Sequence, residues 1–342
     1  MQEPFPALTH LMLSSDIEIA PVVPYSLIGG SAPRLQFLQM EHLSIPGLPK
    51  LLLSATDLVH LKLLRIPHSG YISPEAMVTC LSTLPRLEKL FLKFKSPRSR
   101  PNRENRRLPP HTRSVLPALI KLTFAGVSEY LEDLVARIDS PLLNRLSIRL
   151  FHQLIFDTPQ LFEFISRTPT LGVHDEAQVS FSELNVQVSF TNTPSSGFRL
   201  TLIILCRQPE WQLSSIAQIC ASLLSRSSIH TVKRLHIRET THSALEWQDD
   251  IDGSQWLELL HPFTAVKEFC LSEEFVPRIA PSLQMLVGGR TTEVLPALRT
   301  LLLETYQFGP FEGAMEKFFA ARRLSNHPVD TSVRKFVKRQ LV

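Results

Sequence analysis

The sequence predicts an α/β solenoid in which parallel strands form one concave sheet and helices lie outside it. The first observation is a short apolar pattern at i, i+3 and i+5, as in "LPRLEKLFLKF" at residues 84–94, which recurs along the chain. The second is the spacing, because successive patterns mostly begin 23 to 34 residues apart, and self-similarity at such a period is typical of stacked repeats. The third is that helical stretches separate the patterns.

The apolar pattern is strand-like. Its second and third positions straddle one polar residue, so two side chains point inward from the same face of a strand, and the first position packs where the chain enters that strand. Nine strands are expected on this basis, at residues 10–13, 37–41, 60–64, 89–94, 121–125, 145–149, 234–238, 268–272 and 300–304.

A gap of 89 residues separates the sixth pattern from the seventh. Division by three gives about 30, close to the other steps, so the gap is expected to hold two more units. The candidates are Phe181/Leu184/Val186 and Leu200/Ile203/Leu205. Residues 177–206 are nevertheless irregular, and they also fit a β-hairpin because "TNTPSSG" suits a loop.

Helices are expected between the strands, where the sequence is apolar or amphipathic at helical spacing. The expected ranges are 73–84, 129–138, 158–168, 212–227, 254–260 and 276–287. Proline stands two residues before the first apolar position of six patterns, where it ends a helix and favours extended backbone. An ordinary α/β sheet protein with leucine-rich strands is the alternative, and it is disfavoured because such a core rarely repeats one pattern so often.

Composition excludes several classes. The chain has 342 residues, 44% of them hydrophobic, and a net charge of +4, which is small for a dedicated nucleic-acid binder. Its four cysteines form no Cys-x-x-Cys pair, so neither a zinc site nor a disulfide framework is indicated. The start "MQEPFPALTH" lacks the features of a signal peptide, and no apolar run is long enough for a membrane span. We therefore expect a cytoplasmic or nuclear protein in a reducing compartment.

No catalytic or metal-binding motif stands out. The sequence has no G-x-G-x-x-G, G-x-x-x-x-G-K-[ST], H-E-x-x-H or G-x-S-x-G. "QDDIDGSQWLEL" at residues 248–259 faintly suggests a calcium loop, but Gln248 and Leu259 occupy the first and last ligand positions, where Asp and Glu are required. We expect no enzyme, no metal and no cofactor.

A basic segment, "KFKSPRSRPNRENRRLPPHTR", covers residues 93–113 and contains one acid, Glu104. Its prolines and its lack of periodicity predict a disordered insertion at 96–113. A solvated loop is the favoured interpretation, and nuclear import or binding of a polyanion such as nucleic acid is the alternative. The arginines of this basic insertion are Arg98, Arg100, Arg103, Arg106 and Arg107.

The concave sheet face is predicted to be cationic. Residues that flank the inward positions point away from the core, and neighbouring strands lie about 4.8 Å apart, so the cations of units three to six form one patch. A solvated surface is one interpretation, and a docking site for an acidic protein segment with Phe91 as apolar anchor is the other. The predicted partner-binding residues are Lys62, Lys89, Phe91, Lys93, Lys121, Arg145 and Arg149. Further along, the same face is expected to carry Arg234, His236 and Arg238, with the fewer acids Glu41, Glu183, Glu268 and Glu304.

The repeats resemble leucine-rich repeats, although the asparagine or cysteine that usually follows the strand is missing. Their irregular length resembles the long, degenerate class found in F-box proteins. "YLEDLVARIDSPLLNRLSI" and "DDIDGSQWLELLHPFTAVKEFCLS" look like the repeat region of a large family of basidiomycete F-box-like proteins, and the likeness covers most of residues 1–325. The resemblance implies a right-handed leucine-rich-repeat solenoid (horseshoe) over 1–325, followed by a basic tail at 326–342.

The same resemblance implies a function. Such a chain would be a non-enzymatic protein-recognition platform, the substrate-binding part of an F-box-type ubiquitin-ligase receptor. Members of the family usually carry an amino-terminal F-box that docks on the adaptor of a cullin ligase. No Leu-Pro-x-Glu-like start precedes "PALTHLML", so the adaptor is an expected partner only if an F-box precedes this chain.

Overall fold

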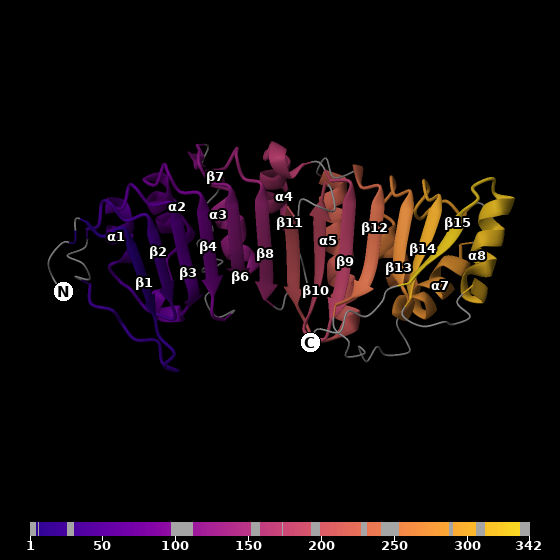
Figure 1. The fold of residues 1–342 in the computed structure, drawn as a ribbon, viewed down its shortest axis with the longest axis horizontal. Helices are drawn as coiled ribbons and strands as arrows, with labels where there is room; N and C mark the ends of the chain where they lie inside the picture. The colour runs from indigo at the N-terminus through magenta and orange to yellow at the C-terminus, as the bar shows by residue number, and fades with distance from the viewer. Residues whose placement is uncertain are drawn as a thin grey trace. The chain divides into compact units, whose positions relative to one another are not determined.

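The chain folds into two compact units in a computed structural model (Figure 1). The first unit comprises Met1–Gln153 and Asp157–Gly172, and the second comprises Leu154–Phe156 and Val173–Val342. The structure describes residues 5, 7–25, 31–96, 112–151, 158–172, 174–192, 199–226, 231–240, 253–286, 290–305 and 312–335.

The first unit is built on six parallel strands, each of which pairs with the next. All six strands predicted for this part of the sequence are present. They are β1 (His10–Ser14), β2 (Phe37–Glu41), β3 (His60–Ile66), β4 (Lys89–Phe94), β6 (Lys121–Gly126) and β8 (Arg145–Phe151). Two short strands, β5 (Ser114–Val115) and β7 (Ile138–Asp139), pair with each other, also in parallel.

The register of these strands stacks the pattern leucines. Leu61, Leu90, Leu122 and Leu146 are directly paired across four neighbouring strands, and all four are buried. Because side chains alternate along a strand, this row fixes which residues point to the opposite face.

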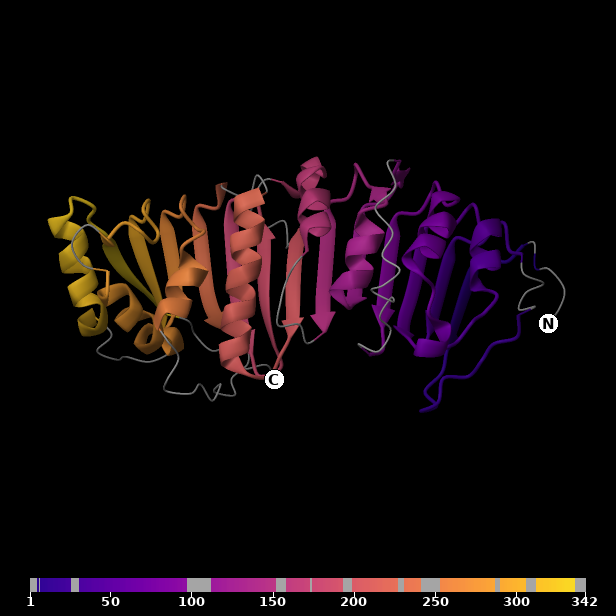
Figure 2. The same cartoon turned by 180° about the vertical axis from the view of Figure 1, so that it is seen from behind.

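Helices cover the leucine side of the first unit's strands, in front of which they lie in Figure 2. Three of them, α2 (Pro74–Ser82), α3 (Ser128–Val135) and α4 (Pro159–Ser166), overlap predicted ranges, whereas α1 (Leu48–Ser54) was not expected. The single-turn helices η2 (His68–Gly70) and η4 (Pro169–Leu171) complete the unit. The Ser73 hydroxyl accepts a hydrogen bond from the Ala76 N–H at 3.2 Å and so caps α2, as its Ser-Pro start predicts.

Two charged groups, the buried Glu132 and the half-buried Arg167, join α3 to α4. The Glu132 carboxylate accepts hydrogen bonds from the N–H groups of Gln160 and Leu161, at 2.9 and 2.8 Å, and so satisfies donors in the first turn of α4. The Arg167 guanidinium, just after α4, donates to the Asp139 carboxylate and to the carbonyl of Val135. Successive repeats are therefore connected by polar contacts as well as by packed leucines.

Seven strands lie in the described part of the second unit. Five run in parallel in the order β9, β12, β13, β14 and β15, and β10 pairs in antiparallel fashion with both β9 and β11. Their bounds are β9 (Glu176–Ser182), β10 (Asn185–Thr191), β11 (Leu200–Leu205), β12 (Arg234–Glu239), β13 (Glu268–Ser272), β14 (Thr300–Thr305) and β15 (Asp330–Lys335). The last three predicted strands correspond to β12, β13 and β14.

The two repeat units expected between residues 177 and 206 are wrong. The hairpin alternative is confirmed for β10 and β11, the strands before and after "TNTPSSG", whereas the turn between β9 and β10 was not expected. Leu184 lies in the turn between β9 and β10, so Phe181 and Val186 belong to different strands. In β11 the buried residues are Leu200, Leu202 and Ile204, whereas Ile203 is half-buried on the other face. The i, i+3, i+5 pattern matched here because long apolar strands satisfy it by chance.

Helices of the second unit are α5 (Pro209–Arg226), α6 (Gly253–Leu260), α7 (Val276–Gln284) and α8 (Glu312–Leu324), together with the single turn η6 (Glu273–Phe275). The first three overlap predicted ranges, and α8 was not expected. Strand β15 lies within the segment assigned to the basic tail, so residues 330–335 of that segment are part of the sheet.

Arg322 of α8 is a fully buried cation. Its guanidinium donates to the carbonyls of Thr291, Leu295 and Leu298, at 3.0 to 3.3 Å. Burial lowers the pKa of this guanidinium. Because Arg322 satisfies three carbonyls that lie ahead of β14, it ties the last helix to the preceding loop.

Candidate functional site

The first unit's strands bring together all seven predicted partner-binding residues on the face opposite the leucine row. We call this set the cationic face: Lys62, Lys89, Phe91, Lys93, Lys121, Arg145 and Arg149. Its members are half-buried or exposed, and α1–α4 lie on the other side of the strands.

Parallel register arranges this face in three rows that cross the strands. The first row contains Lys89, Lys121 and Arg145, which are directly paired on β4, β6 and β8. The middle row contains Phe91, Thr123 and Ser147, with Lys62 paired to Phe91 from β3. The third row contains Lys93, Ala125 and Arg149. Two rows rich in cations thus flank a middle row whose side chains on β6 and β8 are small.

Two lysine ammonium groups lie over the Phe91 ring. The Nζ atom of Lys62 lies 5.6 Å from the Phe91 ring centroid, and that of Lys121 lies 5.1 Å from it. Lys62 also lies 5.0 Å from the Phe37 ring centroid. Cation–π contacts of this length position the charge over the ring. Phe91 therefore orients lysines, a role that differs from the free apolar anchor that the sequence suggested.

Two aromatic residues next to this face were not predicted as site residues. Phe37 and His60 are directly paired on β2 and β3, and His60 continues the row of Lys89. Each stands two residues after the first apolar position of its pattern, the same position as Lys89 and Lys121, so the repeat alignment contained the signal.

The cationic face carries unbalanced positive charge. Burial and the neighbouring charges of Arg145, Lys89, Lys93 and Lys62 lower the pKa of Lys121. Burial and the charge of Lys89 lower the pKa of His60, against the smaller opposing effect of Glu88. Within the part of the chain that the structure describes, none of the six cations forms an ion pair with a carboxylate. An anion from a partner would relieve this repulsion.

The corresponding face of the second unit differs because its Arg234 is paired with two carboxylates. The Arg234 guanidinium lies 2.7 Å from the Glu268 carboxylate and 3.3 Å from that of Glu176. His236 Nε2 lies 3.4 Å from Glu176. Burial raises the pKa of Glu304, and the charge of Arg238 opposes this shift.

The remaining predicted acids do not neutralise the cationic face. Glu41 is paired with Arg65 at 3.1 Å. Glu183 lies in the turn between β9 and β10, so its expected place on a strand face was wrong. The turn arises because the hairpin replaces the repeat unit in which Glu183 had been placed.

The five arginines predicted for the basic insertion, Arg98, Arg100, Arg103, Arg106 and Arg107, lie outside the described residues. At its borders, Lys95 Nζ lies 3.0 Å from His42 Nε2, and Arg113 donates to the Glu163 carboxylate at 3.0 Å.

Two observations concern nucleophilic catalysis and metal binding. Cys270 is directly paired with His236, but burial raises the pKa of its thiol to about 12, so the thiol stays protonated and is a poor nucleophile. Among the residues that the structure describes, no group of three His, Cys, Asp or Glu side chains could hold a metal ion.

No helix among the described residues is long and apolar enough to cross a membrane.

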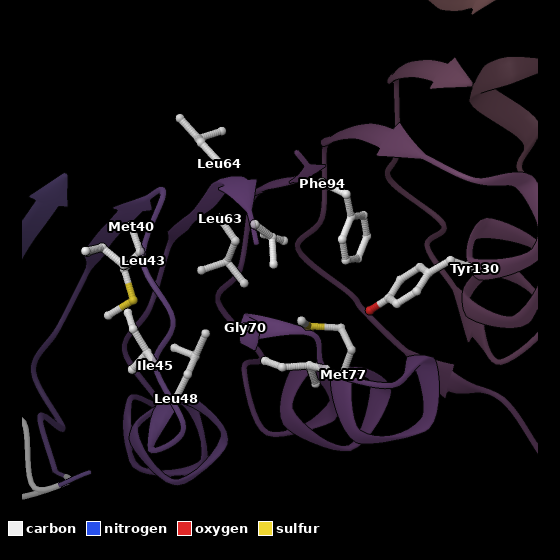
Figure 3. A pocket seen from close by; sticks show the side chains of 12 residues that line it. Met40, Leu43, Ile45, Leu48, Leu63, Leu64, Gly70, Met77, Phe94 and Tyr130 are labelled. Atoms are coloured by element: carbon white, nitrogen blue, oxygen red, sulfur yellow. The ribbon is translucent and has the colours of Figure 1, made fainter. Parts of the chain in front are cut away.

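A small cavity lies beneath the first unit's strands (Figure 3). Its volume of about 20 Å³ is room for about one water, and its lining includes Met40, Leu63, Met77 and Phe94. The Tyr130 hydroxyl points into it in Figure 3 and has no hydrogen-bond partner among the described residues. Burial raises the pKa of this hydroxyl. This cavity is too small for a ligand.

A larger hollow lies on the helical side of the second unit. Its volume is about 420 Å³, and its lining includes Ala217 of α5, Leu257 and Glu258 of α6, and Arg290 and Val294 after α7. Sequence analysis did not predict it because two separate helices and residues that follow α6 and α7 contribute to it.

No protein-family model matches this sequence. No curated protein matches it either. Among solved structures, the chain is similar to the leucine-rich repeat-containing protein LegL7 from Legionella pneumophila. The identity is 12%, the match covers 93% of this chain and 96% of that chain, and the TM-score is 0.35.

Proposed function

We propose that this protein is a non-enzymatic recognition platform that binds an acidic segment of another protein on the cationic face. The observation that supports this is the set of six cations that share one face in fixed register, with no ion pair to a carboxylate among the described residues. Such a surface attracts acidic partners and accelerates their association, and salt weakens the effect.

The biological role that we propose is that of the substrate-binding part of an F-box-type ubiquitin-ligase receptor, in the cytoplasm or nucleus. The strand–helix repeats of irregular length and the resemblance to basidiomycete F-box-like proteins support it, as they support a right-handed leucine-rich-repeat horseshoe. A cullin-ligase adaptor is a partner in this proposal only where an F-box precedes the chain. Co-purification of an upstream-extended product with the adaptor would support this role, and recovery of acidic proteins without it would count against it.

Nucleic-acid binding through the basic insertion is the competing function. The sheet itself is poorly suited to it, because single strands bind by stacking bases on aromatic rings. On this face the rings of Phe37 and Phe91 are already contacted by the ammonium groups of Lys62 and Lys121.

Charge reversal tests the proposed binding face. The variant K89E/K121E/R145E changes the net charge by −6 on the first row. The control K50E/K317E/R323E makes the same change at exposed helix positions. Captured proteins are identified by mass spectrometry at physiological salt. We expect the first variant to lose the captured acidic proteins and the control to retain them. Equal capture by both variants would exclude the cationic face as the binding site.

A further inference from the structure

The spacing of the rows on the cationic face can be compared with the dimensions of a partner. Lys89, Lys121 and Arg145 occupy paired positions on three neighbouring strands, so the first row spans about 9.6 Å at a strand spacing of about 4.8 Å. The rows follow one another every two residues, so the first and third rows are about 13 Å apart along the strands.

These two lengths discriminate between forms of an acidic segment. On an α-helix, residues i and i+7 lie on one face and are about 10.5 Å apart, because the rise is about 1.5 Å per residue. On an extended chain, same-side residues i and i+4 are about 13 Å apart. The helical spacing therefore differs from the row of three cations by about 1 Å, and the extended spacing differs from it by about 4 Å.

The middle row provides space for such a helix. Thr123 and Ser147 are small and half-buried, and they lie between the row of Lys89 and the row of Lys93. A helix with side chains is about 10–12 Å wide, which fits between rows that are about 13 Å apart. The apolar ring of Phe91 lies at the β4 end of the same row, where it contacts the ammonium groups of Lys62 and Lys121.

We propose that the partner segment is an acidic amphipathic helix that lies across β4, β6 and β8. Its carboxylates face Lys89, Lys121 and Arg145 on one flank and Lys93 and Arg149 on the other. Its small or apolar side chains rest on the middle row. This inference rests on the proposed function, because it specifies the partner of the same face.

Three fluorescent peptides of equal length test the inference by anisotropy at physiological salt. One is an acidic helix fixed by a side-chain lactam. The second has the same residues in an order that places its prolines centrally, which prevents a helix. In the third, lysine replaces glutamate. We expect the acidic helix to bind at least about tenfold more tightly than the proline-interrupted peptide, and the lysine peptide not to bind.

Two variants separate the effect of steric fit on peptide binding from the effect of charge. T123W/S147W fills the middle row and keeps every cation, so it should weaken binding of the acidic helix by about tenfold or more and leave the proline-interrupted peptide unaffected. K89E/K121E/R145E should abolish binding of both acidic peptides. Circular dichroism and thermal unfolding confirm that each variant is folded.

The outcomes are distinct. Equal affinity for the two acidic peptides, or an undiminished helix affinity in T123W/S147W, would overturn the helical partner and leave an acidic-segment platform in place. Failure of both acidic peptides to bind the folded wild-type protein would overturn the proposed function as well. Displacement of the acidic helix by single-stranded RNA at equal charge concentration would assign the face to nucleic acid and would likewise overturn both proposals.

Discussion

Replacement of Glu132 by alanine tests whether polar contacts between repeats stabilise the first unit. The Glu132 side chain is 3% exposed, and its carboxylate accepts from the N–H groups of Gln160 and Leu161 at 2.9 and 2.8 Å. Alanine would leave both donors at the start of α4 without this acceptor. We therefore expect α4 to unfold before the strands that precede it in the chain.

The expected magnitude follows from the two hydrogen bonds. A hydrogen bond to a charged group contributes about 1.5–3 kcal/mol, so the two together give about 3–6 kcal/mol. Water that reaches the half-buried Gln160 after the substitution offsets part of this loss. We therefore expect E132A to lower the free energy of unfolding by about 2–4 kcal/mol. The Gln160 and Leu161 amides should exchange hydrogen faster than those of α2.

Urea denaturation and amide hydrogen exchange followed by NMR give the two measurements. E163A is the matched control, because Glu163 lies on α4 and its side chain is half exposed in its ion pairs with Arg113 and Arg167. Exposed pairs contribute at most about 1 kcal/mol. If E132A were no less stable than E163A, and if the exchange rates at the start of α4 were unchanged, the assignment of Glu132 as a helix cap would be refuted.

Three further outcomes are expected. R322M should lower the free energy of unfolding by about 2–5 kcal/mol in urea titrations, because three buried carbonyls lose their donor, whereas R323M should be nearly neutral because Arg323 is exposed. The Cys270 thiol, whose pKa is raised to about 12, should resist iodoacetamide in the folded protein and react in urea, as read by mass spectrometry. His60, whose pKa is lowered, is neutral at pH 7; it binds more protons unfolded than folded, so its contribution to stability falls as the pH drops below about 6.5. H60Q should lessen this loss in melting experiments between pH 7.5 and 5.5, and an unchanged pH dependence in H60Q would contradict the role of His60.

The parallel strands were predictable because the positions of Leu61, Leu90 and Leu122 report both burial and register. The rows of Lys89, Lys121 and Arg145 follow from the same register, since side chains alternate along each strand. The antiparallel pair of β10 and β11 was left as an alternative, whereas the turn between β9 and β10 was not expected, because apolar alternation in "VSFSELNVQVSF" does not reveal strand direction.

Other features required coordinates. Arg234 pairs with Glu176, 58 residues earlier, and that contact depends on a strand order that the hairpin alters. The positions of the lysine ammonium groups over the Phe91 ring depend on side-chain rotamers, which a repeat alignment does not encode. β15 is mostly polar and exposed, so "DTSVRK" lacks the apolar pattern that marks the other strands.

The antiparallel hairpin also has a consequence for the order in which the second unit assembles. β9 and β10 are joined by a turn at Glu183 and Leu184, whereas the parallel pairing of β9 with β12 joins Glu176 to Arg234 across 58 residues. Closing the longer loop costs about 3 kcal/mol more conformational entropy than closing a two-residue turn, and short hairpins form within about 1–10 μs. The hairpin should therefore form early and present the free edge of β9 as the template on which β12 and the later strands assemble in turn.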